Sequence, residues 1–152
     1  MASYAQNTGV SVERSRAEIE TIVKRYGASK FANGWDGEGA TILFEMKNRR
    51  VRFDVPIPPL EEFRKMVKWG KERELPDGEA QKLHDQEVRR RFRALLLIIK
   101  AKLEAVESNI TTFEEEFLAH IVLPGGQTVG EWLTPQIETS YEKGKLPPLL
   151  PR

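Results

Sequence analysis

A long stretch from Glu79 to Ser108 constrains the fold of this chain more than any other segment. Apolar side chains recur in it at helical spacing. They are Val88, Phe92, Leu95, Leu96, Ile99, Leu103 and Val106. Leu97 and Ile98 add apolar surface outside this stripe. We therefore expect a long core helix that is buried on more than one side, by a sheet and by later helices or another subunit.

Two segments before this helix alternate apolar and polar residues, as strands with one buried face do. They run from Ala40 to Lys47 and from Arg50 to Ile57. Asn48-Arg49 lies between them as a tight hairpin turn, and Phe31 to Trp35 is a candidate for a short first strand. The pattern predicts an antiparallel hairpin whose apolar face the long helix covers.

The segment before the strands, "SVERSRAEIETIVKRYGAS", has an apolar stripe at helical spacing. Ser11 is a suitable N-cap, and Gly27 is a suitable stop at the other end. The segment after the strands is ambiguous. It fits either one helix from Leu60 to Trp69, followed by a turn at "LPDG", or an insertion covering residues 60–80.

The sequence of the C-terminal third predicts short helices. Thr112 and Glu115 have the spacing of a capping box, at the start of a helix in "TFEEEFLAHIVL". Two further short helices are expected, Thr128 to Leu133 and Pro135 to Lys143, because proline is tolerated near a helix start.

The order of elements predicts an α+β fold: an N-terminal helix, an antiparallel β-hairpin or three-stranded sheet, a long core helix and short C-terminal helices. We expect residues 1–12 to form an N-terminal arm, residues 13–143 a single domain, and residues 144–152 a proline-rich tail.

Composition limits the classes of function. The chain has 152 residues, with 24 Lys and Arg against 23 Asp and Glu, so any basic surface must be local. It has no cysteine, which excludes disulfides and thiolate metal sites and favours a cytoplasmic location. The N-terminus does not resemble a signal peptide. The longest apolar run, Ala94 to Ile99, is too short to span a bilayer.

Basic residues gather in two places. Lys47, Arg49, Arg50 and Arg52 belong to the hairpin, and Arg89, Arg90, Arg91 and Arg93 to the long helix. A basic strand face beside a basic helix could contact phosphates, and Trp35 could stack on an unpaired base. The alternative is that the helix arginines pair with nearby acids such as Asp85 and Glu87.

The sequence offers little for catalysis or metal binding. Glu116 and His120 are four residues apart and would share a helix face, but a metal site needs more ligands than this pair. We find no nucleophile motif and no phosphate-binding loop. We expect a non-catalytic protein without a cofactor.

Three segments, "VERSRAEIETIVKRYGASKF", "RFRALLLIIKAKLEAVESNITTFEEEFLAHIVLPGGQTVGEWL" and "GKLPPLLP", resemble a family of short uncharacterised proteins of bacteriophages and prophages. This resemblance implies a phage or host-cytoplasm setting and no particular activity. The order of helix, hairpin and long helix is also similar to that of double-stranded-RNA-binding domains and of phage single-strand annealing proteins.

Two functions follow as hypotheses. The first is binding of single-stranded or deformed DNA without base specificity, with a role in recombination or replication. In that case Arg50, Arg52, Arg89 and Arg93 would converge on one open face. The second is a protein-interaction module, a homo-oligomer or an inhibitor of a host or phage protein. It would have its arginines paired with acids, and apolar residues of the long helix or the tail against another chain.

Overall fold

The computed structural model describes residues 9–146, except for the side chains of residues 66–68. Helix α1 (Val12–Arg25) precedes a three-stranded antiparallel sheet, β1 (Lys30–Trp35), β2 (Gly39–Met46) and β3 (Arg49–Pro56), in the order β1-β2-β3. The long helix α2 (Asp77–Glu107) and the short C-terminal helices follow. The predicted α+β class is confirmed. The predicted tail lies outside the described residues from position 147 on.

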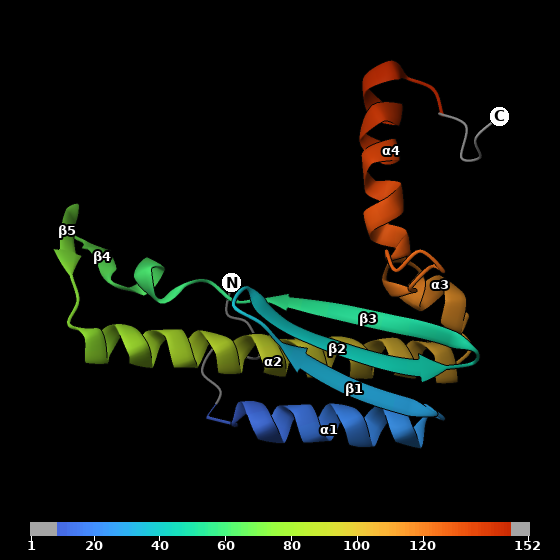
Figure 1. The fold of residues 1–152 in the computed structure, drawn as a ribbon, viewed down its shortest axis with the longest axis horizontal. Helices are drawn as coiled ribbons and strands as arrows, with labels where there is room; N and C mark the ends of the chain where they lie inside the picture. The colour runs from blue at the N-terminus through green and yellow to red at the C-terminus, as the bar shows by residue number, and fades with distance from the viewer. Residues whose placement is uncertain (1–8, 147–152) are drawn as a thin grey trace.

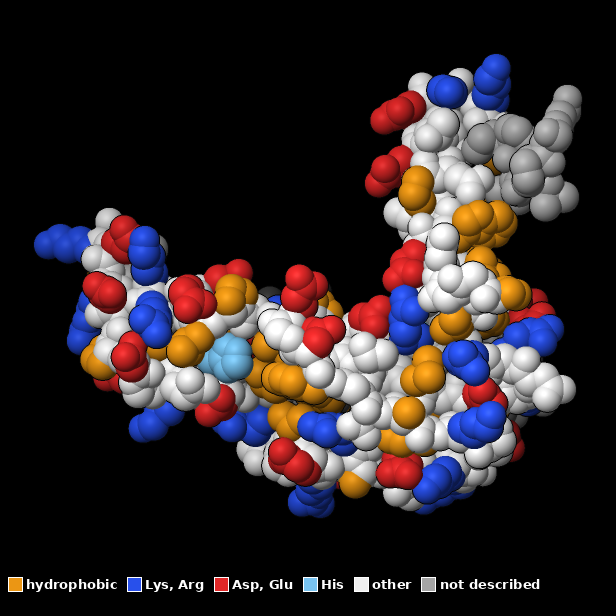
Figure 2. All heavy atoms as spheres, viewed as in Figure 1, with side chains coloured by type: hydrophobic (Ala, Val, Ile, Leu, Met, Phe, Trp, Pro, Cys, Tyr) orange, Lys and Arg blue, Asp and Glu red, His pale blue; other side chains and the backbone are white. Residues whose placement is uncertain are grey.

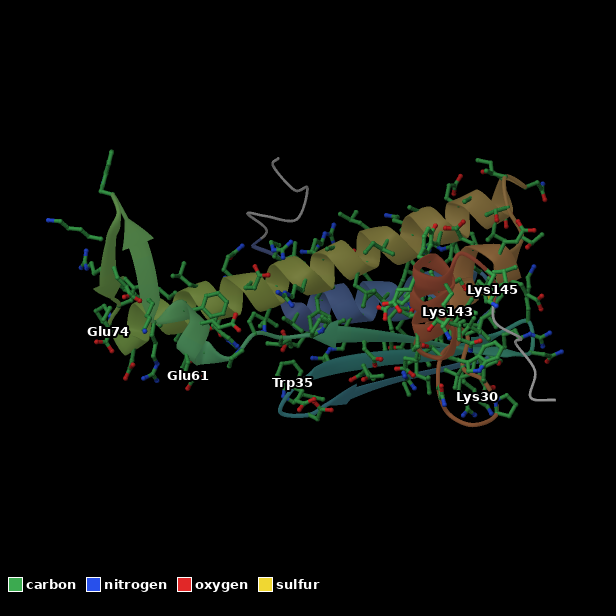
Figure 3. All side chains as sticks on the ribbon, turned by 90° about the horizontal axis from the view of Figure 1, so that it is seen from above. Lys30, Trp35, Glu61, Glu74, Lys143 and Lys145 are labelled. Atoms are coloured by element: carbon green, nitrogen blue, oxygen red, sulfur yellow. The ribbon has the colours of Figure 1, made fainter. Side chains whose placement is uncertain are left out.

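The fold has two layers, with α1 and α2 side by side behind one face of the sheet (Figure 1, Figure 3). Alternate residues of β2 and β3 supply the apolar face, as the pattern predicted. The buried residues of the two strands are Ala40, Ile42, Phe44, Met46, Val51, Phe53 and Val55. The opposite face of the sheet is open and carries mostly polar side chains.

The hairpin turn lies one residue earlier than predicted. Met46 pairs with Arg49, so Lys47 and Asn48 are the two turn residues. Both have positive φ, 50° and 60°. A two-residue turn of this kind matches the right-handed twist of the strands, and asparagine tolerates it better than most residues.

Helix α2 buries the predicted stripe. Leu95, Leu96, Ile99 and Leu103 are at most 6% exposed, which confirms their assignment to the core. The expectation that α2 is buried on more than one side is wrong for the single chain, because Leu97 and Ile98 are 37% and 46% exposed. They point away from the sheet, onto the outer surface of the helix.

The predicted helix from Leu60 to Trp69 is absent. A short 3₁₀ helix, η1 (Leu60–Phe63), is followed by a second hairpin, β4 (Lys65–Lys68) and β5 (Lys71–Glu74). Trp69 and Gly70 form its turn, both with positive φ. The predicted turn at "LPDG" is also incorrect, because Asp77 begins α2 directly after Pro76. This hairpin lies near the start of α2, away from the main sheet (Figure 1).

The C-terminal segments fasten to the sheet before leaving it. The side chain of Thr112 caps α3 (Phe113–Phe117), which continues into the 3₁₀ helix η2 (Leu118–His120). Ile121 bridges to Val51, and the Val122 N–H donates to the carbonyl of Arg50 at the outer edge of β3. This bridge ends the helix earlier than "TFEEEFLAHIVL" predicted.

Helix α4 (Val129–Lys143) is one continuous helix and not two short ones. Thr128 and Glu131 form a capping box, and Pro135 lies inside the helix. The predicted break at Pro135 is wrong because the cap at Thr128 starts a helix that continues through the proline. α4 projects away from the two layers (Figure 1).

At the other end, Ser11 caps α1 as predicted, and the helix starts at Val12, one residue inside the expected arm. Residues 1–8 of that arm lie outside the described residues. No helix of the described part of the chain is long and apolar enough to cross a membrane.

Neighbouring leucines of α2 provide a test of this packing. Leu96 is 1% exposed and Leu97 is 37% exposed. We expect Leu96→Ala to lower the free energy of unfolding by about 2–5 kcal/mol, because it leaves a cavity between α2 and the sheet. Leu97→Ala should cost less than about 1 kcal/mol. Urea denaturation of both variants measures the difference, and equal losses would contradict the packing.

Candidate interaction surface

The basic residues on the open face of the sheet are paired with carboxylates. Glu45 of β2 lies between two cations, 3.2 Å from the Arg50 guanidinium and 3.3 Å from the Lys30 ammonium. The hydrogen bond from Arg50, followed by that from Lys30, lowers the pKa of Glu45. Glu45 therefore compensates one of the two positive charges on this part of the face.

Arg52 of β3 fixes the base of α4. Its Nε lies 3.2 Å from a carboxylate oxygen of Asp54, and its two terminal nitrogens donate to the Gly126 carbonyl at 2.8 Å and to Glu131 at 2.5 Å. The pKa of Glu131 is lowered, first by the Thr128 N–H and then by Arg52. Arg52 is thus a structural link between strand, loop and helix.

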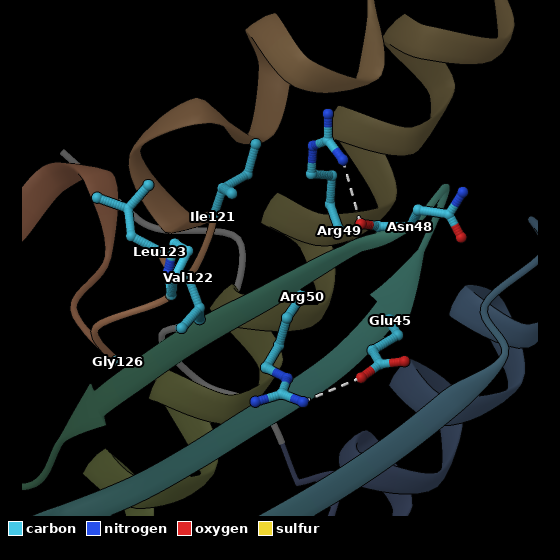
Figure 4. Close-up of a pocket in the computed structure, with 9 residues that line it drawn as sticks. Glu45, Asn48, Arg49, Arg50, Ile121, Val122, Leu123 and Gly126 are labelled. Carbon is cyan, nitrogen blue, oxygen red and sulfur yellow. Dashed lines mark hydrogen bonds and ion pairs between the residues drawn. The ribbon is translucent and has the colours of Figure 1, made fainter.

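Arg49 and Lys47 lie at the tip of the β2–β3 hairpin, where Arg49 pairs with Glu114 of α3 at 2.9 Å. Figure 4 shows the hollow of about 620 Å³ between this tip and the loop before α4. Its lining combines Arg49, Arg50 and Glu45 with apolar residues of the loop, including Val122 and Leu123. Because both arginines have carboxylate partners, the hollow is not a strongly basic site.

The arginines of α2 also have partners. Glu87 accepts from both Arg90 and Arg91, at 2.6 and 2.8 Å. Arg91 donates in addition to the carbonyl of Pro56, at the end of β3. The hydrogen bond from Arg90 is the main reason why the pKa of Glu87 falls to about 2.

Arg93 pairs with Glu18 of α1 at 2.9 Å, and so joins the two helices behind the sheet. Arg89 donates to Gln86, one turn earlier in α2, at 2.7 Å. Arg89 and Trp35 line the same hollow of about 290 Å³ at the far end of β1. These two are the predicted residues that the fold brings together from separate segments.

The predicted basic residues therefore do not converge on one open face. Arg50 and Arg52 lie on the open face of the sheet, whereas Arg93 binds α1 on the opposite side. Arg49 lies at the hairpin tip, and Arg89 lies at the other end of the sheet beside Trp35. Arginines that are paired with carboxylates and lie on several different surfaces are poorly suited to binding along a phosphate backbone.

Helix α4 carries a row of apolar side chains that are half-buried near its base and exposed toward its end. Val129, Leu133, Ile137 and Tyr141 follow one another at intervals of four residues, with Trp132 beside them. Val129 and Leu133 are half-buried, Ile137 is 47% and Tyr141 87% exposed, and no residue of α4 is fully buried. We call this set the α4 stripe.

Acids occupy a different side of α4. Glu131, Glu138 and Glu142 follow one another at spacings that place them on one face of the helix, well away from Leu133 and Ile137. Figure 2 shows carboxylates on one side of the projecting helix and hydrophobic side chains on the other. α4 is thus amphipathic, and in the described part of the chain it packs on η2 and binds Arg52 at its base.

The α4 stripe was not predicted from the sequence, because two short helices separated before Pro135 were expected. The signal was present in the four-residue spacing that continues from Val129 to Tyr141 across the proline. The close fit at the base of α4 was not visible in the sequence. There, a Cβ atom on Gly130 would lie 2.9 Å from the Ala119 carbonyl oxygen.

The Glu116–His120 pair is not arranged as a metal site. Glu116 pairs with Lys102, and the His120 ring stacks on Phe53 with 4.0 Å between ring centres. Within residues 9–146, no three His, Asp or Glu side chains are grouped as metal ligands. Comparisons with protein families, with curated proteins and with solved structures found no match to this chain.

Acid should weaken the fold through Glu87. Its pKa is lowered from 4.5 to about 2, so its stabilising effect is complete above pH 4.5 and is lost as the pH falls through about 2. We expect Glu87→Gln to cost on the order of 2 kcal/mol at neutral pH, and this difference from the native protein to vanish near pH 2. Urea denaturation at several pH values measures it. Glu142→Gln, on exposed α4, is the control and should show no comparable pH-dependent loss.

Removing the Arg52 link should loosen α4 locally. We expect Arg52→Met to lower stability by about 1–3 kcal/mol, because the carboxylates of Asp54 and Glu131 lose a shared partner. Hydrogen exchange should become faster in residues 121–132 and stay unchanged in the middle of α2. Arg50→Met, which removes a neighbouring arginine that does not contact α4, is the matched control. Equal exchange in the two variants would argue against the link.

Proposed function

We propose that this protein is a protein-interaction module that presents α4 to a partner protein. The observation that carries the proposal is the α4 stripe, an exposed apolar row on a projecting helix whose other side is acidic. Exposed apolar residues on a helix that lies outside the described hydrophobic core are typical of a binding surface.

Helix α4 gains little stability from the rest of the described chain. A helix of 15 residues is marginal in water when it has few tertiary contacts. Its capping box and the left-handed Gly144 at its end stabilise the two termini, but its middle is not part of the described hydrophobic core. An apolar groove that receives Leu133, Ile137 and Tyr141 would bury the stripe and leave the acids in solvent.

Nucleic-acid binding is the weaker candidate. Binding phosphates through Arg50, Arg52, Arg90 or Arg93 would require these side chains to leave the carboxylates that they contact. On the sequence resemblance alone, we place the protein partner among host or phage proteins. We propose no catalytic role for this chain.

Two variants in the α4 stripe test the proposal. The tagged protein is used to isolate partners from the host cell, and each candidate is then purified and titrated. Ile137→Asp and Leu133→Asp should weaken the measured affinity by at least about tenfold, since each puts a charge into the expected apolar contact. Glu142→Lys, on the acidic side of α4, should bind as the native protein does.

Two results would overturn the proposal. One is a purified partner whose affinity is the same for native protein and for both stripe variants. The other is retardation of single-stranded or duplex DNA or RNA at low salt that Arg50→Ala and Arg52→Ala abolish, because that outcome assigns the binding to the basic residues.

A further inference from the structure

Strand β1 is an edge of the main sheet, and among the described residues no strand pairs with its outer side. Figures 1 and 3 show β1 as the outermost strand, with α1 behind the sheet and, in the view of Figure 1, lying past the outer edge of β1. The Asp36 N–H donates to Gly39, which fixes the alternation of the antiparallel ladder. By that alternation, the backbone groups of Phe31, Asn33 and Trp35 point away from β2. Within the described part of the chain no hydrogen bond reaches them.

The two outer edges of the sheet differ in whether another segment bonds to them. The outer edge of β3 is bridged by Ile121 and Val122, and Pro56 ends the strand. β1 has neither a bridge nor a proline, and its pairing with β2 is regular along all six residues. Natural proteins usually protect an edge of this kind. Trp35, at its end, is also 61% exposed.

We propose that β1 pairs with β1 of a second copy of this chain, antiparallel about a two-fold axis at Asn33. The two three-stranded sheets then form one continuous sheet of six strands. Asn33 lies opposite itself in this register, and the outward backbone groups of Phe31 and Trp35 complete the ladder with those of the second copy.

The side chains of β1 are complementary to themselves in this register. Lys30, which also pairs with Glu45, lies opposite Asp36 of the second copy, just past the end of β1, where the carboxylate accepts from the Glu38 and Gly39 N–H groups. The charges at the two ends of the β1–β1 pairing are therefore opposite. Phe31 lies opposite Trp35 of the second copy on the helix side, which covers the exposed indole with a second aromatic ring. On the open face, Ala32 meets Gly34 of the second copy, and neither side chain obstructs the approach.

This inference does not rest on the proposed role of α4. The proposed seam is the pairing of β1 with β1 of the second copy, whereas α4 is attached beside β3 at the opposite edge of the sheet (Figure 1). A protein that dimerises without binding a partner through α4 would refute the proposed function alone. A protein that binds through α4 as a monomer would refute the dimer alone.

Light scattering of the native protein, over a wide concentration range, is the first measurement. We expect the mass of a dimer. Asn33→Pro removes an N–H that points away from β2, so the ladder inside each sheet keeps its bonds while the seam loses both hydrogen bonds of its central Asn33 pair, one from each copy. This variant should be monomeric, or should dimerise at least about tenfold more weakly. A native protein that stays monomeric at the highest concentration would overturn the proposal.

A second variant gives an answer even if Asn33→Pro does not fold. The chain has no cysteine, so Asn33→Cys carries a single thiol, placed on the two-fold axis. Mild oxidation should join two copies through this residue in high yield. Ser108→Cys, exposed at the end of α2, should give little cross-linking under the same conditions. Equal cross-linking of the two variants, or none at position 33, would overturn the proposed seam.

Discussion

The apolar face of β2 and β3 is the constraint on which the rest of the structure depends. Phe44, Phe53 and their neighbours on alternate positions cannot stay in water, and α1 and α2 together cover them. Phe117 of α3 closes the same core, since its ring meets Phe44 and Phe53 edge-on at 6.0 and 6.3 Å between ring centres. The chain that follows Phe117 therefore begins at a fixed place beside β3.

That fixed place determines where α4 starts and in which direction it leaves. The bridge of Ile121 to Val51 carries the chain along the edge of β3, and Arg52 then holds both the loop and Glu131. Gly130 allows the backbone of α4 to approach Ala119 closely. With its base fixed in this way, α4 extends from the edge of the sheet, and no core residue within positions 9–146 packs against its apolar stripe.

The features that could be predicted from the sequence are those set by periodicity. The faces of β2 and β3 and the buried stripe of α2 follow from spacings of two and of three to four residues. The hairpin turn was misplaced because Lys47, an unusual residue for positive φ, takes the first turn position. The hairpin of β4 and β5 was missed because "KERE" has no apolar alternation. The pairing of helix arginines with Glu87 was among the predicted alternatives, and Arg90 and Arg91 confirm it. The partners of Arg93 and Arg52 could not be predicted, because Glu18 and Glu131 are distant from them in sequence.

The two surfaces left uncovered lie at opposite edges of one sheet, and this arrangement links the two proposals. Pairing through β1 joins the sheets at one edge, so α4 of each copy extends from an outer edge of the six-stranded sheet. A two-fold dimer then presents two identical helices to its surroundings. A partner that is itself two-fold, or that repeats its binding groove, can engage both helices at once, and the second contact then forms at a high effective concentration. Each α4 stripe is short for a tight interface, and a dimer compensates for this by offering it twice.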